Sequence, residues 1–535
     1  MSQVHVPSVA DRIVERLAQH GVSILFGYPG GQLTPIYDAL YRTPGVRHIL
    51  ARHEQAAAFM ADGYARATGQ PGVCLAVCGP GVYNAATPLA TADTDSIPVL
   101  LLSGQVPLAG RGRRTGYYHE NEQLEASAFF SQTQVCIESP DQVADLVDFA
   151  WRQLTERRPG PVLLEVPVDV LREPAPDPLP PLPPPPARPK PDAATLDSLV
   201  AALQEARRPI LLAGGGVSRS GAEAALRQLA ERLGAPVFHT ANGKCALPGS
   251  HPLAAGMPWT RVTSDLSQMA DLFSPLWKVT DFLLAVGCRF TQLATGSWTI
   301  PLPARRAQID IDPGELGRHY PLEIGLVGDA RATLEKLLAR LPTETRSPWA
   351  SLPAKKEPWR LPGIDPLGPI ARALPANGLV SADVTRLAYM AMAELPLEGA
   401  RSFLHPAGSV AMGYGLPAGL GARAAFPDRP VLVLVGDGGF QMSAMELATA
   451  AQERLPVVVL LVNDSCLTLI KSTQERKYAR RFIGVDLHNP DFGQFCRAFG
   501  ADHQLIASEA HLEEALRSAF AAKHTTVLEV RPSQE

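Results

Sequence analysis

The sequence predicts an α/β protein made of three doubly wound domains, each with a parallel sheet. Its 535 residues suffice for about three domains, at roughly 100 to 200 residues per domain. Short runs of Val and Leu that end in Gly, Asp or Asn recur along the chain, which is typical of parallel strands buried on both faces. Two proline-rich stretches divide these runs into three groups. Ligands of such sheets bind at the carboxyl ends of the strands.

The proline-rich stretches indicate where the domains end. Residues 173–192 read EPAPDPLPPLPPPPARPKPD, which cannot supply the amide donors of a helix or a central strand and predicts an extended connector. The stretch 342–369 mixes Pro, Trp, Lys and Gly without apolar periodicity and predicts a second linker. We therefore expect domains at 1–172, 193–341 and 364–535.

Within each domain, amphipathic helical segments alternate with the apolar runs. The expected strands lie in VCLAVCG (73–79), PVLLLSG (98–104), PILLAGGG (209–216), DFLLAVG (281–287), PVLVLVGDG (430–438) and PVVVLLVND (456–464). The glycines that end these runs either line ligand-binding loops or only make tight strand-to-helix turns.

Charge and composition exclude several classes of function. With 49 Lys and Arg against 53 Asp and Glu, the net charge is -4, so no general basic field exists for nucleic acid or a membrane surface. We find neither a signal-peptide pattern nor an apolar run of transmembrane length. The seven cysteines are scattered and form no C-x-x-C pair, which predicts reduced thiols. We expect a cytoplasmic protein that acts on a small molecule, with no nucleic-acid or membrane partner.

The third domain carries the strongest local pattern, VLVLVGDGGFQMSAMELATAA, in which a buried strand is followed by a helix. The strand ends in Gly436, Asp437, Gly438 and Gly439. Such glycines let the backbone approach a phosphate, and a carboxylate there can hold a divalent cation. The next strand ends at Asn463 and Asp464, and Asp464 lies 27 residues after Asp437. This is the length of one strand-helix-strand crossover, so the pattern predicts a magnesium diphosphate site at two adjacent strand ends.

GDG followed at this interval by two asparagines is the thiamine diphosphate motif, and the chain resembles it with Asp464 in place of the second Asn. The resemblance implies that Asp437 and Asp464 ligate Mg²⁺ through their side chains and Cys466 through its backbone carbonyl. Asp464 adds a negative charge beside a diphosphate, and we expect a nearby cation such as Lys471 to offset it. A shift of one residue would make Asn463 the ligand instead.

A second segment, DVTR (383–386), follows another predicted strand in the third domain. It can present a helix N-terminus, the Thr385 hydroxyl and the Arg386 guanidinium to the same diphosphate. The alternative is that this segment only caps a surface helix.

In the first domain, Glu54 opens a predicted helix directly after a short strand. By itself, a Glu in the first helical turn is explained by the helix dipole. The surrounding RHEQAAAFMADGYAR (52–66), however, closely resembles the segment that carries the catalytic glutamate of acetolactate synthases. In that class the glutamate hydrogen-bonds N1′ of the aminopyrimidine and favours the imino tautomer, which removes the proton from the thiazolium C2. The resemblance implies this role for Glu54.

The resemblance to the acetolactate synthase branch extends over almost the whole chain. Further matching segments are FGYPGGQLTPIYDAL (26–40), CGPGVYNAATPLATADTDSIPV (78–99), SGQVP (103–107) and GSVAMGYGLPAGLGA (408–422). They imply that Gly30 and Gly31 line the reacting centre, that Met412 is an apolar wedge under the cofactor, and that the Val410 carbonyl accepts from the 4′-amino group. Without this match, Met412 would be interpreted as a flexible core filler.

The resemblance also implies an assembly. Its three domains are a pyrimidine-binding domain, a central Rossmann-like domain and a diphosphate-binding domain. In the family the cofactor lies between the first domain of one subunit and the third domain of another. We therefore expect a homodimer or homotetramer with active sites between subunits.

Three departures from acetolactate synthases fall on substrate-handling positions. In LAGRGRRTGYYHENEQ (108–123), Tyr118 and His119 align with a Phe and a Gln of the family. His119 either relays a proton to the carbanion or is an exposed loop histidine. Leu293 replaces the arginine associated with the second oxo acid, and Thr473 replaces a tryptophan of the acceptor pocket. Upstream lie three arginines that either face solvent or bind an anionic substrate, Arg111, Arg113 and Arg114.

In the central domain, GGG (214–216) and QIDIDPGE (308–315) fit a nucleotide-binding unit, and relatives use this domain for FAD, for ADP or for neither. For the whole chain, the sequence favours a Mg²⁺ and thiamine diphosphate-dependent, acetolactate synthase-like carboligase. It would form an acyl carbanion from a 2-oxo acid and transfer it to a carbonyl acceptor. The alternatives are non-oxidative decarboxylation of a 2-oxo acid, cleavage of a 2-hydroxyacyl-CoA, and a non-catalytic paralogue that binds the cofactor.

Overall fold

The computed structural model describes residues 6–185, 187–259, 273–352 and 361–532. Two compact units can be distinguished. The first contains the chain up to residue 187 together with 408–428 and 443–456, and the second contains 188–407, 429–442 and 457–535. None of the helices in these described ranges has the length and apolar character needed to cross a bilayer.

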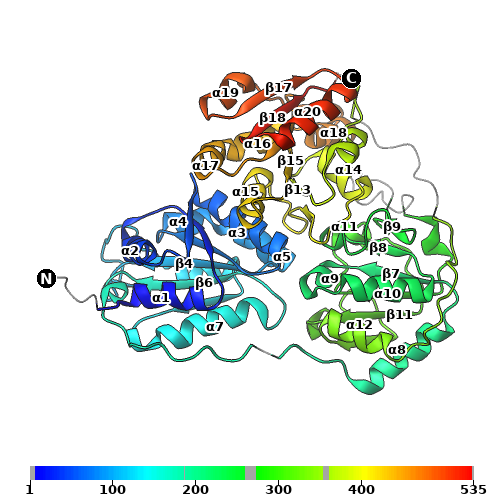
Figure 1. Cartoon of the computed structure of the whole chain (residues 1–535), viewed down its shortest axis with the longest axis horizontal. Helices are drawn as coiled ribbons and strands as arrows, with labels where there is room; N and C mark the ends of the chain where they lie inside the picture. The colour runs from blue at the N-terminus through cyan, green and yellow to red at the C-terminus, as the bar shows by residue number, and fades with distance from the viewer. Residues whose placement is uncertain (1–5, 186, 260–272, 353–360, 533–535) are drawn as a thin grey trace. The chain divides into compact units, whose positions relative to one another are not determined.

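Three six-stranded sheets flanked by helices make up the fold (Figure 1). Every strand pair recorded within the sheets is parallel, as in the pairs β3–β4, β10–β7 and β15–β16. This confirms the predicted α/β class with three parallel-sheet domains. The predicted domain limits themselves stay predictions.

The first sheet lies in the first unit and has the strand order β2-β1-β3-β4-β6-β5. Its strands are β1 (Ile24–Gly27), β2 (Arg47–Leu50), β3 (Gly72–Ala76), β4 (Val99–Gln105), β5 (Thr133–Cys136) and β6 (Val162–Pro167). Its helices are α1 (Val9–Gln19), α2 (Thr34–Arg42), α3 (Glu54–Thr68), α4 (Pro80–Asn84), α5 (Ala86–Asp95), α6 (Gln123–Ala126) and α7 (Val143–Thr155). Every residue of β3 and β4 is buried, as the apolar runs predict for central strands.

Two helices from the C-terminal part of the chain also belong to the first unit, α15 (Gly415–Ala425) and α17 (Leu447–Glu453). The α15 helix crosses α3 at backbone distance, because a Cβ atom on Gly63 would collide with the Ala418 carbonyl and one on Gly421 with the Met60 carbonyl. These two glycines therefore allow a helix crossing that no larger residue permits.

The second sheet has the order β12-β11-β10-β7-β8-β9, which is the Rossmann order when its strands are counted from β7. Its strands are β7 (Pro209–Ala213), β8 (Val237–His239), β9 (Ala254–Gly256), β10 (Phe282–Val286), β11 (Arg306–Asp310) and β12 (Ile324–Val327). Its helices are α8 (Ala193–Glu205), α9 (Gly215–Ser220), α10 (Glu223–Leu233), α11 (Gln292–Thr295) and α12 (Ala330–Leu338).

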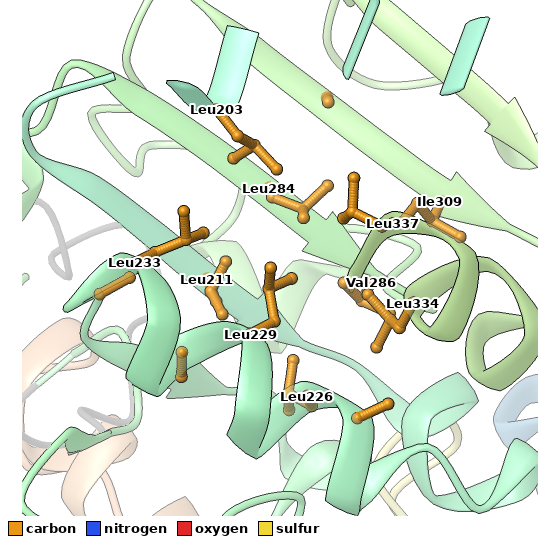
Figure 2. Close-up of a cluster of buried hydrophobic side chains, with 14 of the residues drawn as sticks. Leu203, Leu211, Leu226, Leu229, Leu233, Leu284, Val286, Ile309, Leu334 and Leu337 are labelled. Atoms are coloured by element: carbon orange, nitrogen blue, oxygen red, sulfur yellow. The ribbon is translucent and has the colours of Figure 1, made fainter. Parts of the chain in front are cut away.

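Figure 2 shows the core of this second sheet. Leu211, Leu284 and Val286 point from the strands toward leucines of the covering helices. Among these leucines, Leu229 lies on α10 and Leu334 on α12, and both are fully buried. Because Leu284 and Val286 are two residues apart, they lie on the same face of β10, as the period of a strand requires.

The third sheet lies in the second unit and has the order β14-β13-β15-β16-β18-β17. Its strands are β13 (Leu379–Ala382), β14 (Phe403–Leu404), β15 (Val431–Gly436), β16 (Val458–Val462), β17 (Asp502–Ile506) and β18 (Thr526–Val530). The remaining helices are α13 (Leu367–Ala373), α14 (Arg386–Glu394), α16 (Asp437–Ser443), α18 (Thr468–Lys477), α19 (Phe492–Ala498) and α20 (Glu509–Ala521).

Counted from their own first strands, the first and third sheets share one strand order. In both, the order reverses between the first and third strands, at β1/β3 and at β13/β15. Ligands of doubly wound sheets bind at the carboxyl ends of the strands beside such a reversal. The loops after β1, β3, β13 and β15 are therefore the places where the fold itself predicts binding.

The first proline-rich connector contains no helix or strand in 176–185 and 187–192. Its described part is tied to α1, because Arg16 donates to the carbonyl of Pro180 at 2.7 Å. The same guanidinium forms a buried salt bridge with Asp148 of α7 at 2.5 Å. In the second predicted linker, residues 353–360 lie outside the described ranges, and α13 begins at Leu367.

Candidate active site

Glu54 is the first residue of α3, directly after the loop that follows β2. Its side chain is buried, with 9% of the residue exposed. Asn84 donates from Nδ2 to Oε2 of Glu54 at 3.0 Å. Gly81 lies against the other oxygen, since a Cβ atom there would be 3.3 Å from Oε1. One carboxylate oxygen of Glu54 is thus held by the Asn84 amide, and the other lies beside Gly81, which has no side chain.

Gly30 and Gly31 follow β1, on the same edge of the first sheet. A Cβ atom on Gly30 would be 2.5 Å from the Val77 side chain, whereas one on Gly31 would meet nothing within 4 Å. Val77 also contacts Gly81, where a Cβ atom would be 2.9 Å from its Cγ1. The structure therefore brings Gly30, Gly81 and Glu54 together beside the β1/β3 reversal.

His119 is exposed and has a left-handed backbone, with φ of 65°. Its carbonyl oxygen lies over Gly79, at 2.9 Å from where a Cβ atom would stand. The turn before it is folded around Glu120, whose carboxylate accepts from the N–H groups of Thr115, Gly116 and Tyr117 at 3.0, 2.7 and 3.1 Å. His119 thus lies next to the loop that borders Glu54, with its side chain open to solvent.

Two of the three loop arginines already have carboxylate partners. Arg111 forms salt bridges with Glu138 at 2.6 Å and with Glu165 at 2.9 Å. Arg114 pairs with Glu122 at 3.0 Å. These contacts weaken the expectation that this loop binds an anionic substrate.

Val410 and Met412 lie in the segment before α15, within the first unit. Val410 has φ of 51°, a left-handed conformation that is strained for a β-branched residue and that often occurs at functional sites. The segment ends at Tyr414, whose hydroxyl donates to Asp62 of α3 at 3.0 Å. Asp62 is fully buried and also forms a salt bridge with Arg66 at 2.6 Å. This buried network fixes the segment to the helix that begins with Glu54.

The second group of predicted residues lies in the second unit, around Asp437. Asp437 is the first residue of α16 and is 2% exposed. Its Oδ1 accepts from the Gly438 N–H at 2.9 Å. Burial raises the pKa of Asp437, hydrogen bonds from Asn489 and Gly438 lower it, and the neighbouring charge of Asp464 raises it. A buried carboxylate with a second carboxylate beside it is the arrangement that a divalent cation relieves.

Asn463 and Asp464 have different surroundings. Asn463 donates from Nδ2 to Glu529 at 2.7 Å, and its Oδ1 accepts from Asn489 at 2.8 Å and from the Ser465 N–H at 3.3 Å. Asp464 is only half-buried and accepts from the hydroxyl of Thr468. The amide of Asn463 is thus engaged inside the protein, which leaves Asp464 as the better candidate ligand.

Cys466 lies in a bridge between two loop segments. The bridge uses the Leu467 N–H with the Val485 carbonyl, and the Leu487 N–H with the Ser465 carbonyl, both at 2.8 Å. Neither bond uses the Cys466 carbonyl, which is the atom expected to ligate Mg²⁺.

Lys471 was expected to offset the charge of Asp464, but its direct partner is Asp486, at 2.6 Å. The hydrogen bond to Asp486 is the main cause that raises the pKa of Lys471, and the charge of Asp464 is a lesser one. Lys471 therefore acts on Asp464 only at longer range.

The loops after β13 and β15 face each other at the reversal of the third sheet. Thr385 is the N-cap residue of α14, which begins at Arg386. A Cβ atom on Gly436 would be 3.5 Å from the Thr385 hydroxyl, and one on Gly439 would be 2.8 Å from the carboxylate of Asp383. Because Gly439 has no side chain, the two loops can approach each other closely. The Thr385 hydroxyl and the first residues of α14 and α16 lie where they meet.

The donor set suits Mg²⁺ bound together with a diphosphate. Two carboxylates and a backbone carbonyl are hard oxygen ligands, and substrate phosphates normally complete the shell of this cation. Within the described ranges, no group of three or more His, Cys, Asp and Glu side chains gathers around a metal position. The protein ligands are therefore too few for a metal cage but fit a metal held jointly with phosphate.

Three amides of these two groups were not predicted from the sequence. Asn84 contacts Glu54, Gln123 accepts from the Gly79 N–H at 2.8 Å, and Asn489 contacts Asp437 at 2.6 Å. Asn84 is the last residue of the segment CGPGVYN and Asn489 precedes Pro490, so for these two residues a turn signal is present. Nothing in the local sequence shows the long-range contact.

The central-domain glycines have a packing explanation. A Cβ atom on Gly214 would collide with the Gly287 carbonyl, and one on Gly216 would be 2.6 Å from the Gly287 Cα. These glycines let the loops after β7 and β10 touch at the reversal of the second sheet. They therefore give no support for a bound FAD or ADP.

Models of the thiamine pyrophosphate enzyme family match three parts of the chain. The N-terminal TPP binding domain matches residues 7–128, the central domain 196–337 and the C-terminal TPP binding domain 383–530.

Individual relatives match over nearly full length. A protein of Pseudomonas aeruginosa named probable 2-ketoarginine decarboxylase is 39% identical, covering 97% of this chain and 93% of its own. A probable acetolactate synthase large subunit of Methanocaldococcus jannaschii is 35% identical, covering 97% and 91%. Among solved structures, the thiamine diphosphate-dependent 4-hydroxybenzoylformate decarboxylase of Rhodococcus jostii RHA1 superposes with a TM-score of 0.86 at 26% identity, covering 99% of this chain and 100% of its own.

Proposed function

The chain belongs to the thiamine pyrophosphate enzyme family, and we propose that it is a Mg²⁺-dependent member that decarboxylates a 2-oxo acid. The observation that carries the proposal is the buried Glu54, with one carboxylate oxygen bound by Asn84 and the other beside Gly81. When bound, thiamine diphosphate would supply a cationic thiazolium ring that takes up the electrons of the carbon–carbon bond broken next to the carbonyl.

In this proposal Glu54 holds the aminopyrimidine. Its free carboxylate oxygen would hydrogen-bond N1′ of the ring, while Asn84 keeps the carboxylate oriented by donating to Oε2. Gly81, which has no side chain, leaves room beside that oxygen, and Gly30 and Gly31 would line the reacting centre. The low exposure of Glu54 excludes water, so its hydrogen bond with the ring is stronger than in solvent.

The second unit would bind the diphosphate and its cation. Asp437, Asp464 and the Cys466 carbonyl would ligate Mg²⁺. The Gly436–Gly439 loop and the N-terminus of α14 with Thr385 and Arg386 would contact the phosphate oxygens. Val410 would accept from the 4′-amino group through its carbonyl, and Met412 would separate the two rings. The strained φ of Val410 and the fit of the oxygen donors support these roles.

Decarboxylation is favoured over carboligation by the replacements at the acceptor positions. Leu293 and Thr473 stand where acetolactate synthases have an arginine and a tryptophan, so an acceptor carboxylate would lose its charged partner. Solvent-facing His119 could return a proton to the carbon that loses CO₂. The name of the 39% identical relative agrees with this choice.

Carboligation to a carbonyl acceptor is the second candidate function. It is supported by acetolactate synthase relatives that match nearly the whole chain, at 35% identity for that of Methanocaldococcus jannaschii. Cleavage of a 2-hydroxyacyl-CoA has less support, because Arg111 and Arg114 are paired with carboxylates of the chain.

We also propose a cytoplasmic homodimer or homotetramer whose active sites lie between subunits. Seven free cysteines support a reducing compartment. For the central domain we propose a structural role, since its glycines are explained by the contact of two loops, with FAD or ADP binding as the alternatives.

The test is product analysis with a panel of donors. The protein loaded with Mg²⁺ and thiamine diphosphate is incubated with 2-oxo acids, including 2-ketoarginine and benzoylformates, with and without an aldehyde acceptor, and products are identified by mass. We expect CO₂ and the aldehyde of one donor, and loss of turnover in Glu54→Gln with cofactor binding retained. A 2-hydroxy ketone as main product would replace decarboxylation by carboligation. Full activity of Glu54→Gln would refute the mechanism.

A further inference from the structure

Asn489 lies in the loop between α18 and α19, away from every segment that the sequence predicted to bind the cofactor. Its Nδ2 donates to Oδ2 of Asp437 at 2.6 Å and to Oδ1 of Asn463 at 2.8 Å. Its Oδ1 accepts from Nε2 of Gln441 at 2.7 Å. A single amide thus joins the carboxyl ends of β15 and β16 to helix α16.

We propose that Asn489 is a positioning residue that orients Asp437 for Mg²⁺, an inference that rests on the proposed function. The Gly438 N–H holds one oxygen of Asp437 and Asn489 holds the other. The two carboxylate oxygens have about four acceptor positions, and the N–H groups of Gly438, Ser465 and Asn489 use three of them, so one position can face a cation. With both oxygens held, the carboxylate plane is fixed before the metal arrives, and residues that orient metal ligands in this way contribute to affinity.

Only an amide satisfies this position. Asn489 donates both of its N–H hydrogens and uses its oxygen, so its hydrogen-bonding capacity matches its three partners. An Asp could not donate to Asp437 and would bring a third carboxylate toward Asp437 and Asp464. An apolar residue would remove one donor from the buried Asp437 and one from the buried Asn463.

The backbone is restrained on both sides of Asn489. Two residues before it, the Leu487 N–H donates to the Ser465 carbonyl at 2.8 Å. The following Pro490 restricts residue 489 to extended conformations. Asp491 then caps α19, accepting from the Gln494 N–H at 2.9 Å. The side chain of Asn489 therefore reaches Asp437 from a rigid segment, as a positioning role requires.

The contact also explains why Asn463 is unsuited to ligate the metal. Asn489 and Glu529 hold its two polar atoms, and Glu529 in turn accepts from His503 at 2.8 Å. The network extends from Asp437 through Asn489 and Asn463 to β18. Asp464 lies outside this network and is only half-buried, with the Thr468 hydroxyl as a hydrogen-bond donor.

The experiment measures metal affinity without turnover. In wild type, Asn489→Ala and Asn489→Ser, Mn²⁺ binding is titrated by its electron paramagnetic resonance signal in the presence of thiamine diphosphate, and melting of the metal-free protein is recorded. We expect Asn489→Ala to weaken Mn²⁺ binding by about 10- to 100-fold, and Asn489→Ser, which keeps one donor, to fall between. In both Asn489 variants, excess Mn²⁺ should restore binding of thiamine diphosphate. The control is Asn377→Ala, at an exposed asparagine of the same unit, and it should bind as wild type.

The outcomes separate this inference from the proposed function. If Asp437→Ala weakens Mn²⁺ binding but Asn489→Ala does not, only the role of Asn489 is refuted. If neither variant changes the affinity, the metal site itself is wrong. If Asn489→Ala lowers the melting temperature strongly and excess Mn²⁺ restores nothing, Asn489 has only a structural role.

Discussion

At the scale of single residues, Asn463 and Asp464 show how neighbours in sequence take opposite roles. Asn463 is buried and bonds Glu529 and Asn489, whereas the carboxylate of Asp464 is half-buried and bonds only a hydroxyl nearby, that of Thr468, among its recorded contacts. The first residue therefore belongs to the support of the strand ends. The second is available to a cation.

This difference predicts two distinct phenotypes. Asp464→Ala should weaken Mg²⁺-dependent binding of thiamine diphosphate with little change in melting temperature. Asn463→Ala removes a partner from buried Glu529 and from Asn489, so it should destabilise the protein by about 1 to 3 kcal/mol. Fluorescence titration with the cofactor and thermal melting of the metal-free protein check both. A metal defect in Asn463→Ala that exceeds that of Asp464→Ala, without loss of stability, would reverse the assignment.

Some site residues are predictable from the sequence and others are not. The spacing of Asp437 and Asp464 predicts their placement at neighbouring strand ends, because one crossover fixes which strands are adjacent. Asn489 follows Asp464 by a helix and a loop without regular structure, so no spacing rule brings it back to Asp437. Its position depends on how that loop folds over the sheet edge, which local patterns do not encode.

At the scale of elements, strand prediction succeeded where burial is complete. The runs that form β15 and β16 are almost entirely Val and Leu because helices flank their sheet. The edge strand β17, Asp502–Ile506, reads DHQLI and is largely exposed, so it has no apolar run to detect. Apart from the adjacency of β15 and β16, the order of strands in each sheet likewise depends on packing between elements and was not predicted.

The end of β11 leads to a pH-dependent prediction. Burial raises the pKa of Asp310 from 3.8 to about 6, and the charges of Glu315 and Asp312 raise it while the Asp312 N–H lowers it. The folded protein thus keeps this proton to a higher pH than the unfolded chain does. The stability that this carboxyl contributes is complete below about pH 3.8 and is lost as the pH rises through about 6.

Asp310→Asn cannot ionise and keeps an oxygen that accepts the Asp312 N–H. It should therefore stabilise the protein above about pH 6, by as much as about 3 kcal/mol, with no advantage near pH 4. Thermal melting at about pH 4 and about pH 8 measures the difference. Asp197→Asn, at an exposed carboxylate of the same domain, serves as the control and should change little at either pH. An equal gain at both pH values would show that the charge of Asp310 is not the cause.

At the scale of the whole molecule, the predicted cofactor residues divide between the two compact units. Glu54, Gly30 and Met412 belong to the first, while Asp437 and Asp464 belong to the second. The first and third sheets, which carry most of these residues, share one strand order and present them at the same kind of strand reversal. The residues of the first unit include Glu54 but no candidate metal ligand, and those of the second include the metal ligands but no catalytic glutamate. A complete site therefore needs residues of both kinds of unit. Our proposal takes the two kinds from different subunits.

Mixing two inactive variants tests this proposal. Glu54→Gln lacks the catalytic carboxylate and Asp437→Ala lacks a metal ligand, so each homodimer should be inactive. If each active site takes Glu54 from one subunit and Asp437 from the other, a mixed dimer has one intact site. Random reassociation then restores about a quarter of wild-type activity, since half of the dimers are mixed and each has one of two sites. If both residues of a site came from one subunit, no mixture would regain activity, because every site would lack one of the two groups.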